Sequence, residues 1–244
     1  MPPLHGKVGV LNFHLAPTAF VHFAADSAVL LDTKNNRYHG LQADQAAALQ
    51  MALGQSAAAR YPVVTESDVA TFAAALEARG ILTATAQNGG DSAGPAVIAP
   101  TRSLADTPPE TTAGVNARYA LQTLRLFLRS AFWLNRGRLD TALAHLRKLR
   151  KLQATPTPPR TSGETIDLVR RFDAVRPYIY SGKDKCLLDS LILAQFLLAH
   201  GVSCTFLIGV RTLPFAAHSW VQLDDCVLNC PLYFAQRSNV IVAI

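Results

Sequence analysis

A low-complexity stretch near the middle of the chain divides the sequence into two parts of different character. Residues 83–115 are rich in Ala, Gly, Pro, Ser and Thr and nearly free of aromatic residues. Such a composition cannot bury enough apolar surface to offset the entropy lost on ordering, so it predicts a flexible linker. The net charge changes across this stretch, from −3 over residues 1–114 to +9 over residues 115–244. We therefore expect domains at 1–84 and 116–244, with a linker at 85–115.

The composition restricts the class of protein further. Half of the 244 residues are hydrophobic, which is enough to bury a core in each domain. No apolar run reaches the roughly 18 residues that a membrane-spanning helix needs, and the first residues lack the basic start and apolar core of a signal peptide. The four cysteines at positions 186, 204, 226 and 230 form no CxxC pair, so they predict neither a zinc site nor a disulfide framework. These features predict a cytoplasmic protein with no membrane partner and no metal.

The first domain has the pattern of three short strands followed by two helices. The strand candidates are residues 18–23, 28–33 and 37–40, and the helix candidates are residues 44–53 and 65–79. This order predicts a small winged-helix-like domain. Its net negative charge excludes the electrostatic attraction that nucleic-acid binding requires, so no nucleic-acid partner is expected. A short sheet with an open edge can instead bind an extended peptide through main-chain hydrogen bonds.

Three segments of this domain carry a resemblance to a known family element. Residues 15–17, 28–32 and 37–41, which read LAP, AVLLD and RYHGL, resemble the peptide-recognition element of ribosomal-peptide biosynthesis. That element is similar to the small pyrroloquinoline-quinone chaperone domain and binds a leader peptide as an added strand. The resemblance implies that a precursor leader peptide is a partner of this chain.

The second domain begins with helical patterns and then changes to a pattern that brings a cysteine to a helix start. Helices are expected at 116–135, at 139–152 and from about residue 164 to the Arg176–Pro177 step. Their basic residues favour a solvated face over a docking site for an acidic partner. Cys186 then begins an apolar helix that ends at Gly201. The unpaired N–H groups and the dipole at a helix N-terminus favour a thiolate, and Lys183 and Lys185 would act in the same direction.

A histidine follows this cysteine on a strand pattern. His218 lies 32 residues after Cys186 in the second of two expected strands, residues 203–210 and 215–223, which a turn at Asp224 and Asp225 follows. This separation accommodates a helix, a strand and the return of the chain. A cysteine at a helix start with a histidine on a neighbouring strand is the arrangement of a nucleophile and its general base.

The segments around these two residues resemble a known enzyme superfamily. CLLDSLILAQFLLAHG, FLIGV and PFAAHSWVQL are similar to the transglutaminase-like cysteine proteases and, within them, to the leader peptidase (B protein) of lasso peptide biosynthesis. The resemblance implies an α+β chain whose second domain has a transglutaminase-like, papain-like protease fold. It also implies cleavage of the precursor leader, which frees the core α-amine for macrolactam formation by an asparagine-synthetase-like cyclase. No phosphate loop is visible, so no cofactor is expected to bind directly, and any ATP requirement would be met through the cyclase.

Carried over residue by residue, the resemblance matches Cys186 to the nucleophile and His218 to the base. The family pattern places an aspartate about a dozen positions after the histidine, directly after an asparagine. Here Asn229 is present, but Cys230 follows it, and a thiol would not hold the histidine as a carboxylate does. Three possibilities remain for the third member: Asn229 orients His218, Asp224 or Asp225 reaches in from the turn, or the site is a Cys–His dyad.

Two other functions remain open at this point. A transglutaminase-like acyltransferase would use the same nucleophile and base but would transfer the acyl group to an amine. A non-catalytic precursor-binding scaffold would account for Cys230 as the sign of a degenerate site.

Overall fold

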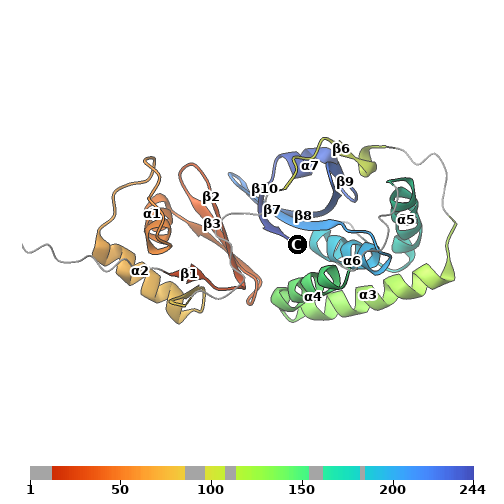
Figure 1. Ribbon diagram of the computed structural model, residues 1–244, viewed down its shortest axis with the longest axis horizontal. Helices are drawn as coiled ribbons and strands as arrows, with labels where there is room; N and C mark the ends of the chain where they lie inside the picture. Colours follow the sequence, from red (N-terminus) through yellow and green to blue (C-terminus); the bar gives the residue numbers. More distant parts are fainter. Residues whose placement is uncertain (1–12, 86–96, 108–113, 154–161, 182–184) are drawn as a thin grey trace, which may run out of the picture. The chain divides into compact units, whose positions relative to one another are not determined.

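The computed structural model describes residues 13–85, 97–107, 114–153, 162–181 and 185–244. The chain separates into two compact units. The first comprises Met1–Asp32 and Tyr38–Ala93, and the second comprises Thr33–Arg37 and Gly94–Ile244. Both units combine helices with sheet (Figure 1), so the α+β class expected from the sequence is confirmed.

The first unit contains a three-stranded sheet, followed in the chain by two helices. The sheet has the order β2-β3-β4, and a separate antiparallel pair joins β1 to β5. The bounds are β1 His14–Leu15, β2 Ala19–Phe23, β3 Ala28–Asp32, β4 Arg37–Leu41, α1 Ala43–Ala52, α2 Glu66–Ala78 and β5 Leu82–Thr83. The three predicted strands and two predicted helices are confirmed to within two residues, whereas β1 was not predicted. The likeness to a winged helix remains a prediction.

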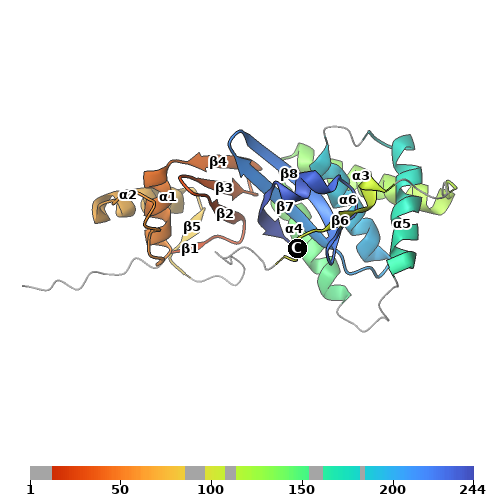
Figure 2. The same cartoon turned by 90° about the horizontal axis from the view of Figure 1, so that it is seen from above.

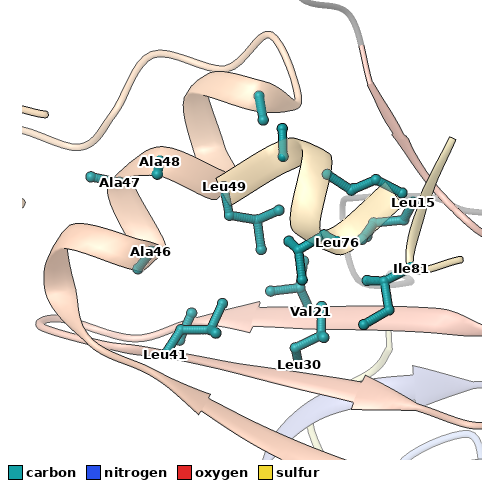
Figure 3. Packing of buried hydrophobic residues seen from close by; sticks show 14 of the residues in the cluster. Leu15, Val21, Leu30, Leu41, Ala46, Ala47, Ala48, Leu49, Leu76 and Ile81 are labelled. Atoms are coloured by element: carbon teal, nitrogen blue, oxygen red, sulfur yellow. The ribbon is translucent and has the colours of Figure 1, made fainter. Parts of the chain in front are cut away.

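Packing between the sheet and the helices forms the core of this unit. Val21, Leu30 and Leu41 point from the strands towards Leu49 and Leu76 of the two helices (Figure 3), and all five side chains are buried. Local sequence fixes where α2 begins, because Thr65 forms a capping box with Asp68. Such a box satisfies two backbone N–H groups that the first turn leaves unpaired.

The second unit is built on a five-stranded sheet with the order β10-β7-β8-β9-β6. Its neighbouring strands are antiparallel except that β6 runs parallel to β9. The bounds are β6 Arg102–Ser103, β7 Thr205–Thr212, β8 Phe215–Leu223, β9 Cys226–Val227 and β10 Asn239–Ala243. The two longest strands, β7 and β8, agree with the prediction, and β9 follows the predicted turn. The strand β10 was not predicted.

Helices cover this sheet, and α6 occupies the centre of the unit (Figures 1 and 2). It packs on β7 and β8 and is contacted by α3, α4 and α5, so its residues from Leu188 to Leu198 are buried. The short α7 also packs on β8. The bounds are α3 Ala117–Asn135, α4 Leu139–Leu152, α5 Ser162–Val175, α6 Cys186–Ala199 and α7 Leu232–Gln236, with 3₁₀ turns η1 Leu104–Asp106 and η2 Arg176–Tyr178. Among the described helices, none has the length and apolar character needed to cross a membrane.

The prediction of a flexible linker is wrong for one part of residues 85–115. Within residues 85–115, Arg102 and Ser103 form strand β6 and pair with Cys226 and Val227 of β9. The buried Ser103 hydroxyl donates a hydrogen bond to the backbone oxygen of Cys230 at 2.6 Å. This order comes from partners more than a hundred residues away, which local composition cannot reveal. Residues 86–96 and 108–113 of the predicted linker lie outside the described residues.

Candidate active site

Cys186 lies at the first residue of α6, as the sequence predicts. In the described part of the chain, no side chain caps this helix; the preceding residue, Lys185, has φ −126° and ψ 41° and leaves the first turn uncapped. Backbone N–H groups in the first turn of a helix have no intrahelical partner. The start of α6 therefore places a thiol beside N–H groups that can bind a developing negative charge.

His218 lies on β8 at a point where the neighbouring strand has ended. It is opposite Gly209 of β7 on one side, whereas β9 pairs only with Gln222 and Leu223 further along β8. The start of α6 reaches this part of β8, where the side chains of Cys186 and His218 are hydrogen-bonded to each other. The structure thus brings together the two residues predicted as nucleophile and base.

The surroundings of Cys186 favour its thiolate. Burial alone would raise the pKa of this thiol, but the hydrogen bond with His218, hydrogen bonding to the Ser219 backbone and the charge of His218 lower the pKa to about 7. The expected contribution of Lys185 to this low pKa stays a prediction, and Lys183 lies outside the described residues. A thiol with a pKa near 7 is substantially ionised at neutral pH.

The other three cysteines have the opposite character. All four thiols are free. Burial raises the pKa of Cys204 to about 12 and also raises the pKa of Cys226. For Cys230, burial and the nearby Cys186, Asp106 and Asp189 together raise the pKa to about 12. Only Cys186 therefore combines partial exposure with a lowered pKa, which is the pattern of a reactive cysteine.

The contact predicted between Asn229 and His218 is not made. The Asn229 Nδ2 donates hydrogen bonds to Asp189 Oδ2 and to Ser190 Oγ, both at 3.0 Å, and its Oδ1 accepts one from the Val221 N–H at 2.9 Å. The physical reason is that β9 ends at Val227, so the Asn229 side chain takes the next N–H along β8. Asn229 connects β8 to the first turn of α6 instead of orienting the imidazole.

The two aspartates of the turn are also engaged elsewhere. Asp225 accepts hydrogen bonds from Thr101 and pairs with Arg102 at 3.3 Å, and these contacts, that with Thr101 first, lower its pKa. Asp224 has φ +51° and forms the turn itself. Among the described residues, none hydrogen-bonds to His218 Nε2, which is buried. Of the three possibilities for the third member, the geometry agrees with the dyad.

A network around Asp189, which the sequence gave no reason to single out, fixes the start of α6. This carboxylate is only 4% exposed. It accepts hydrogen bonds from Arg176 at 3.2 and 3.3 Å, from the Tyr180 hydroxyl at 3.0 Å and from Asn229 at 3.0 Å. A buried charge is stable only when it is paired and hydrogen-bonded, as this one is. The network joins η2, α6 and the chain after β9.

A second connection lies next to the dyad. The Ser190 hydroxyl donates a hydrogen bond to the backbone oxygen of Ser219 at 3.0 Å. Since Ser190 is four residues after Cys186 on α6 and Ser219 follows His218 on β8, this bond links the two elements close to their catalytic candidates. This hydrogen bond helps to keep the Cys186 thiol next to the His218 imidazole.

Comparison with known proteins is consistent with this geometry. Residues 120–236 match the family model of the transglutaminase-like superfamily, so the second unit carries a transglutaminase-like domain. A stretch of 62 residues is 36% identical to the microcin J25-processing protein McjB of Escherichia coli. That stretch covers 25% of this chain and 30% of McjB, so the chain matches less than a third of this relative. No solved structure matches the chain.

Proposed function

We propose that this protein is a leader peptidase of lasso peptide maturation. The observation that carries the proposal is the Cys186–His218 pair, in which hydrogen bonding overcomes burial and lowers the thiol pKa to about 7. The match of residues 120–236 to the transglutaminase-like superfamily and the similarity to a microcin-processing protein support it. The substrate is a precursor peptide, and the product is a core peptide with a free α-amine.

In the proposed reaction, His218 accepts the proton of Cys186 and the thiolate attacks the scissile carbonyl carbon. Backbone N–H groups at the start of α6, including that of Cys186, stabilise the oxyanion. The tetrahedral intermediate collapses to a thioester as His218 gives its proton to the leaving amine of the core peptide. His218 then takes a proton from water, the resulting hydroxide attacks the thioester, and the leader leaves with a new carboxylate.

The first unit would bind the leader. Its sheet has the order β2-β3-β4, so β2 and β4 are the edge strands to which an extended peptide could add. We propose that this unit is the winged-helix-like recognition domain, fused here to the peptidase. The partner that uses the freed amine is an asparagine-synthetase-like macrolactam cyclase, which would also supply any ATP dependence, and the process would take place in the cytoplasm.

Incubation of the protein with a precursor peptide and the cyclase tests this proposal. Mass spectrometry should show a leader and a core peptide separated at one peptide bond, and Cys186→Ala should abolish both products. Cys226→Ala is the matched control, because this buried cysteine has a raised pKa and no predicted role. Leader release that survives in Cys186→Ala would exclude the assignment.

The match to the transglutaminase-like superfamily also favours a second candidate, an acyltransferase. The same thioester would then be resolved by an amine instead of water. A leader fragment whose mass includes an added amine would identify this activity, whereas a leader that ends in a free carboxylate identifies the peptidase.

A further inference from the structure

The Cys186–His218 dyad has no carboxylate or other hydrogen-bonding group, among the described residues, that orients the imidazole. After accepting the thiol proton, an imidazole has to be held in one orientation and stabilised as a cation, which a carboxylate does in Ser–His–Asp sites. Within the described residues, the buried His218 Nε2 has no hydrogen-bond partner. Another part of the structure has to serve this purpose if the dyad is active.

Two aromatic rings lie next to the imidazole. The ring of Trp220 is 6.2 Å from it between centroids, at an interplanar angle of 15°. The ring of Phe234, from α7, is 5.1 Å away at 29°. The Trp220 ring is nearly parallel to the imidazole and the Phe234 ring is tilted, and both are stacked against it with a face of their π-system. Such faces carry partial negative charge and attract cations.

The Trp220 ring is fixed in place. It is 1% exposed, and its Nε1–H donates a hydrogen bond to Gln222 Oε1 at 3.1 Å. The Gln222 amide is itself held, because it donates to the backbone oxygens of Ile98 at 2.7 Å and Asp224 at 2.6 Å. The indole therefore cannot rotate away from His218 without breaking this chain of hydrogen bonds.

Gly209 makes this position of the indole possible. It lies opposite His218 on β7, and a Cβ placed there would be 2.9 Å from two carbons of the Trp220 ring and 2.6 Å from the Ser238 Cβ. Atoms cannot approach so closely, so any larger residue would move the indole or the chain at Ser238. The absence of a side chain at Gly209 is thus part of how the ring is placed.

Phe234 covers the imidazole from α7 and remains partly open to solvent. It is 47% exposed, and the Tyr233 ring contacts it edge-on at 5.5 Å. Arg237 in turn lies 4.3 Å from the centre of the Tyr233 ring. Because Phe234 is at the surface, its ring can be removed without opening the core of the unit.

We propose that Trp220 and Phe234 are positioning residues that orient His218 and stabilise its imidazolium in place of a carboxylate. This inference rests on the proposed function, because it concerns the state of His218 that the dyad mechanism creates. A thiolate paired with an imidazolium is favoured by anything that stabilises the imidazolium. Loss of the π-face of Phe234 should therefore reduce the thiolate fraction of Cys186.

The test uses the full chain and requires no precursor peptide. The rate of Cys186 alkylation by iodoacetamide is measured from pH 5 to pH 9 for the unmodified protein and for Phe234→Leu. Leucine keeps an apolar side chain but has no π-face. We expect the midpoint of the profile to move to higher pH and the rate at pH 7 to fall roughly twofold to fifteenfold, the range that corresponds to a cation–π contact acting on a thiol that is half ionised at this pH. Phe234→Tyr, which keeps the ring, should recover most of the rate.

Phe132→Leu is the matched control. Phe132 is an aromatic residue of similar exposure, 52%, on α3, and it contacts Arg136. Its substitution should leave the alkylation profile unchanged, and thermal melting should show that both leucine variants are folded.

An unchanged alkylation profile in Phe234→Leu would overturn the inference alone. If Cys186 of the unmodified protein reacts no faster than the other three cysteines, the proposed function itself fails and this inference falls with it.

Discussion

At the scale of single residues, the pKa values of the four cysteines predict that an alkylating reagent modifies Cys186 in preference to the other three. The thiolate is the reactive form, and the Cys186 pKa is lowered from 9.0 to about 7. Alkylation of Cys186 should therefore be half-maximal near pH 7, fall about fivefold from pH 7 to pH 6 and then fall about tenfold for each further pH unit. Cys204, Cys226 and Cys230, whose pKa values are raised, should remain unmodified at pH 7. Mass spectrometry of labelled peptides measures this, and equal labelling of all four would contradict it.

Cys230 is the residue at which a carboxylate can be restored. It is 6% exposed, and Asp106 and Asp189 are close enough to raise its pKa. A buried carboxylate beside two others is unfavourable, so Cys230→Asp should lower the free energy of unfolding by roughly 3–5 kcal/mol, the usual cost of an uncompensated buried charge. If the missing carboxylate limits the rate, kcat/KM for leader release should nevertheless be at least that of the unmodified protein.

Denaturant unfolding and steady-state kinetics of Cys230→Asp measure both effects. A loss of activity in a protein that remains folded would instead indicate a specific role for the Cys230 thiol. In this background the effect of Phe234→Leu should become smaller, because the carboxylate would stabilise the same imidazolium. Cys226→Asp serves as a comparison for the cost of burying a carboxylate away from His218.

Sequence reasoning could identify Cys186 and His218, because each depends on a local rule. A helix that begins after a loop places its first residue beside free N–H groups, and a strand pattern fixes which residues alternate. The groups that surround His218 on its other sides could not be found in this way. The hydrogen bonds of Asn229 depend on where β9 ends. Phe234 contacts His218 from α7, a five-residue helix that is too short to show a periodic pattern in the sequence. The HSW spacing could have placed Trp220 on the same face of β8 as His218.

At the scale of elements, the start of α6 is held by the Asp189 network. In Asp189→Asn, Arg176 loses its buried partner, and its side chain is only 27% exposed. Removal of one partner of a buried ion pair typically costs about 3–5 kcal/mol, so a loss of this order in the free energy of unfolding is expected. Alkylation of Cys186 should also slow, because the position of the thiol relative to His218 depends on the same contacts.

Asp173→Asn is the control for Asp189→Asn. Asp173 also pairs with Arg176, at 3.5 Å, but its side chain is 36% exposed. This pair is more open to solvent than the one with Asp189, and ion pairs at the surface contribute about 0–1 kcal/mol, so the loss in denaturant unfolding should be smaller than for Asp189→Asn. Equal effects of the two substitutions would contradict the assignment of Asp189 as the anchor of α6.

The elements that could be predicted from the sequence share one property. Helices α2 and α3 and strands β7 and β8 are each long enough to show a period or a buried run, and α2 has its own cap. In contrast, β6 is only two residues long. Its existence depends on β9, which lies more than a hundred residues further along the chain. Pairing of this kind is a tertiary property and leaves no trace in a local window of sequence.

At the scale of the whole molecule, the pairing of β6 with β9 places the start of the second unit before residue 116, which was the start expected from the sequence. Besides forming β6, the segment from Ile98 to Asp106 contacts β8, the chain after β9 and the start of α7. The Ile98 oxygen holds Gln222, Ser103 holds the backbone at Cys230, and Asp106 accepts from the N–H of Leu232 at the start of α7. The segment predicted as a tether is therefore part of the structure that positions Trp220 and α7.

A comparison of two fragments tests this organisation. Residues 94–244 retain β6 and η1, whereas residues 108–244 lack them. Each hydrogen bond lost contributes about 0.5–1.5 kcal/mol, so the shorter fragment should be less stable in denaturant by roughly 2–5 kcal/mol. Cys230 should also become accessible to iodoacetamide in unfolded and partly opened molecules, because Ser103 no longer holds its backbone. Equal stability and equal Cys230 labelling in the two fragments would mean that the segment is a tether after all, and that Gln222 and α7 hold the aromatic rings around His218 without it.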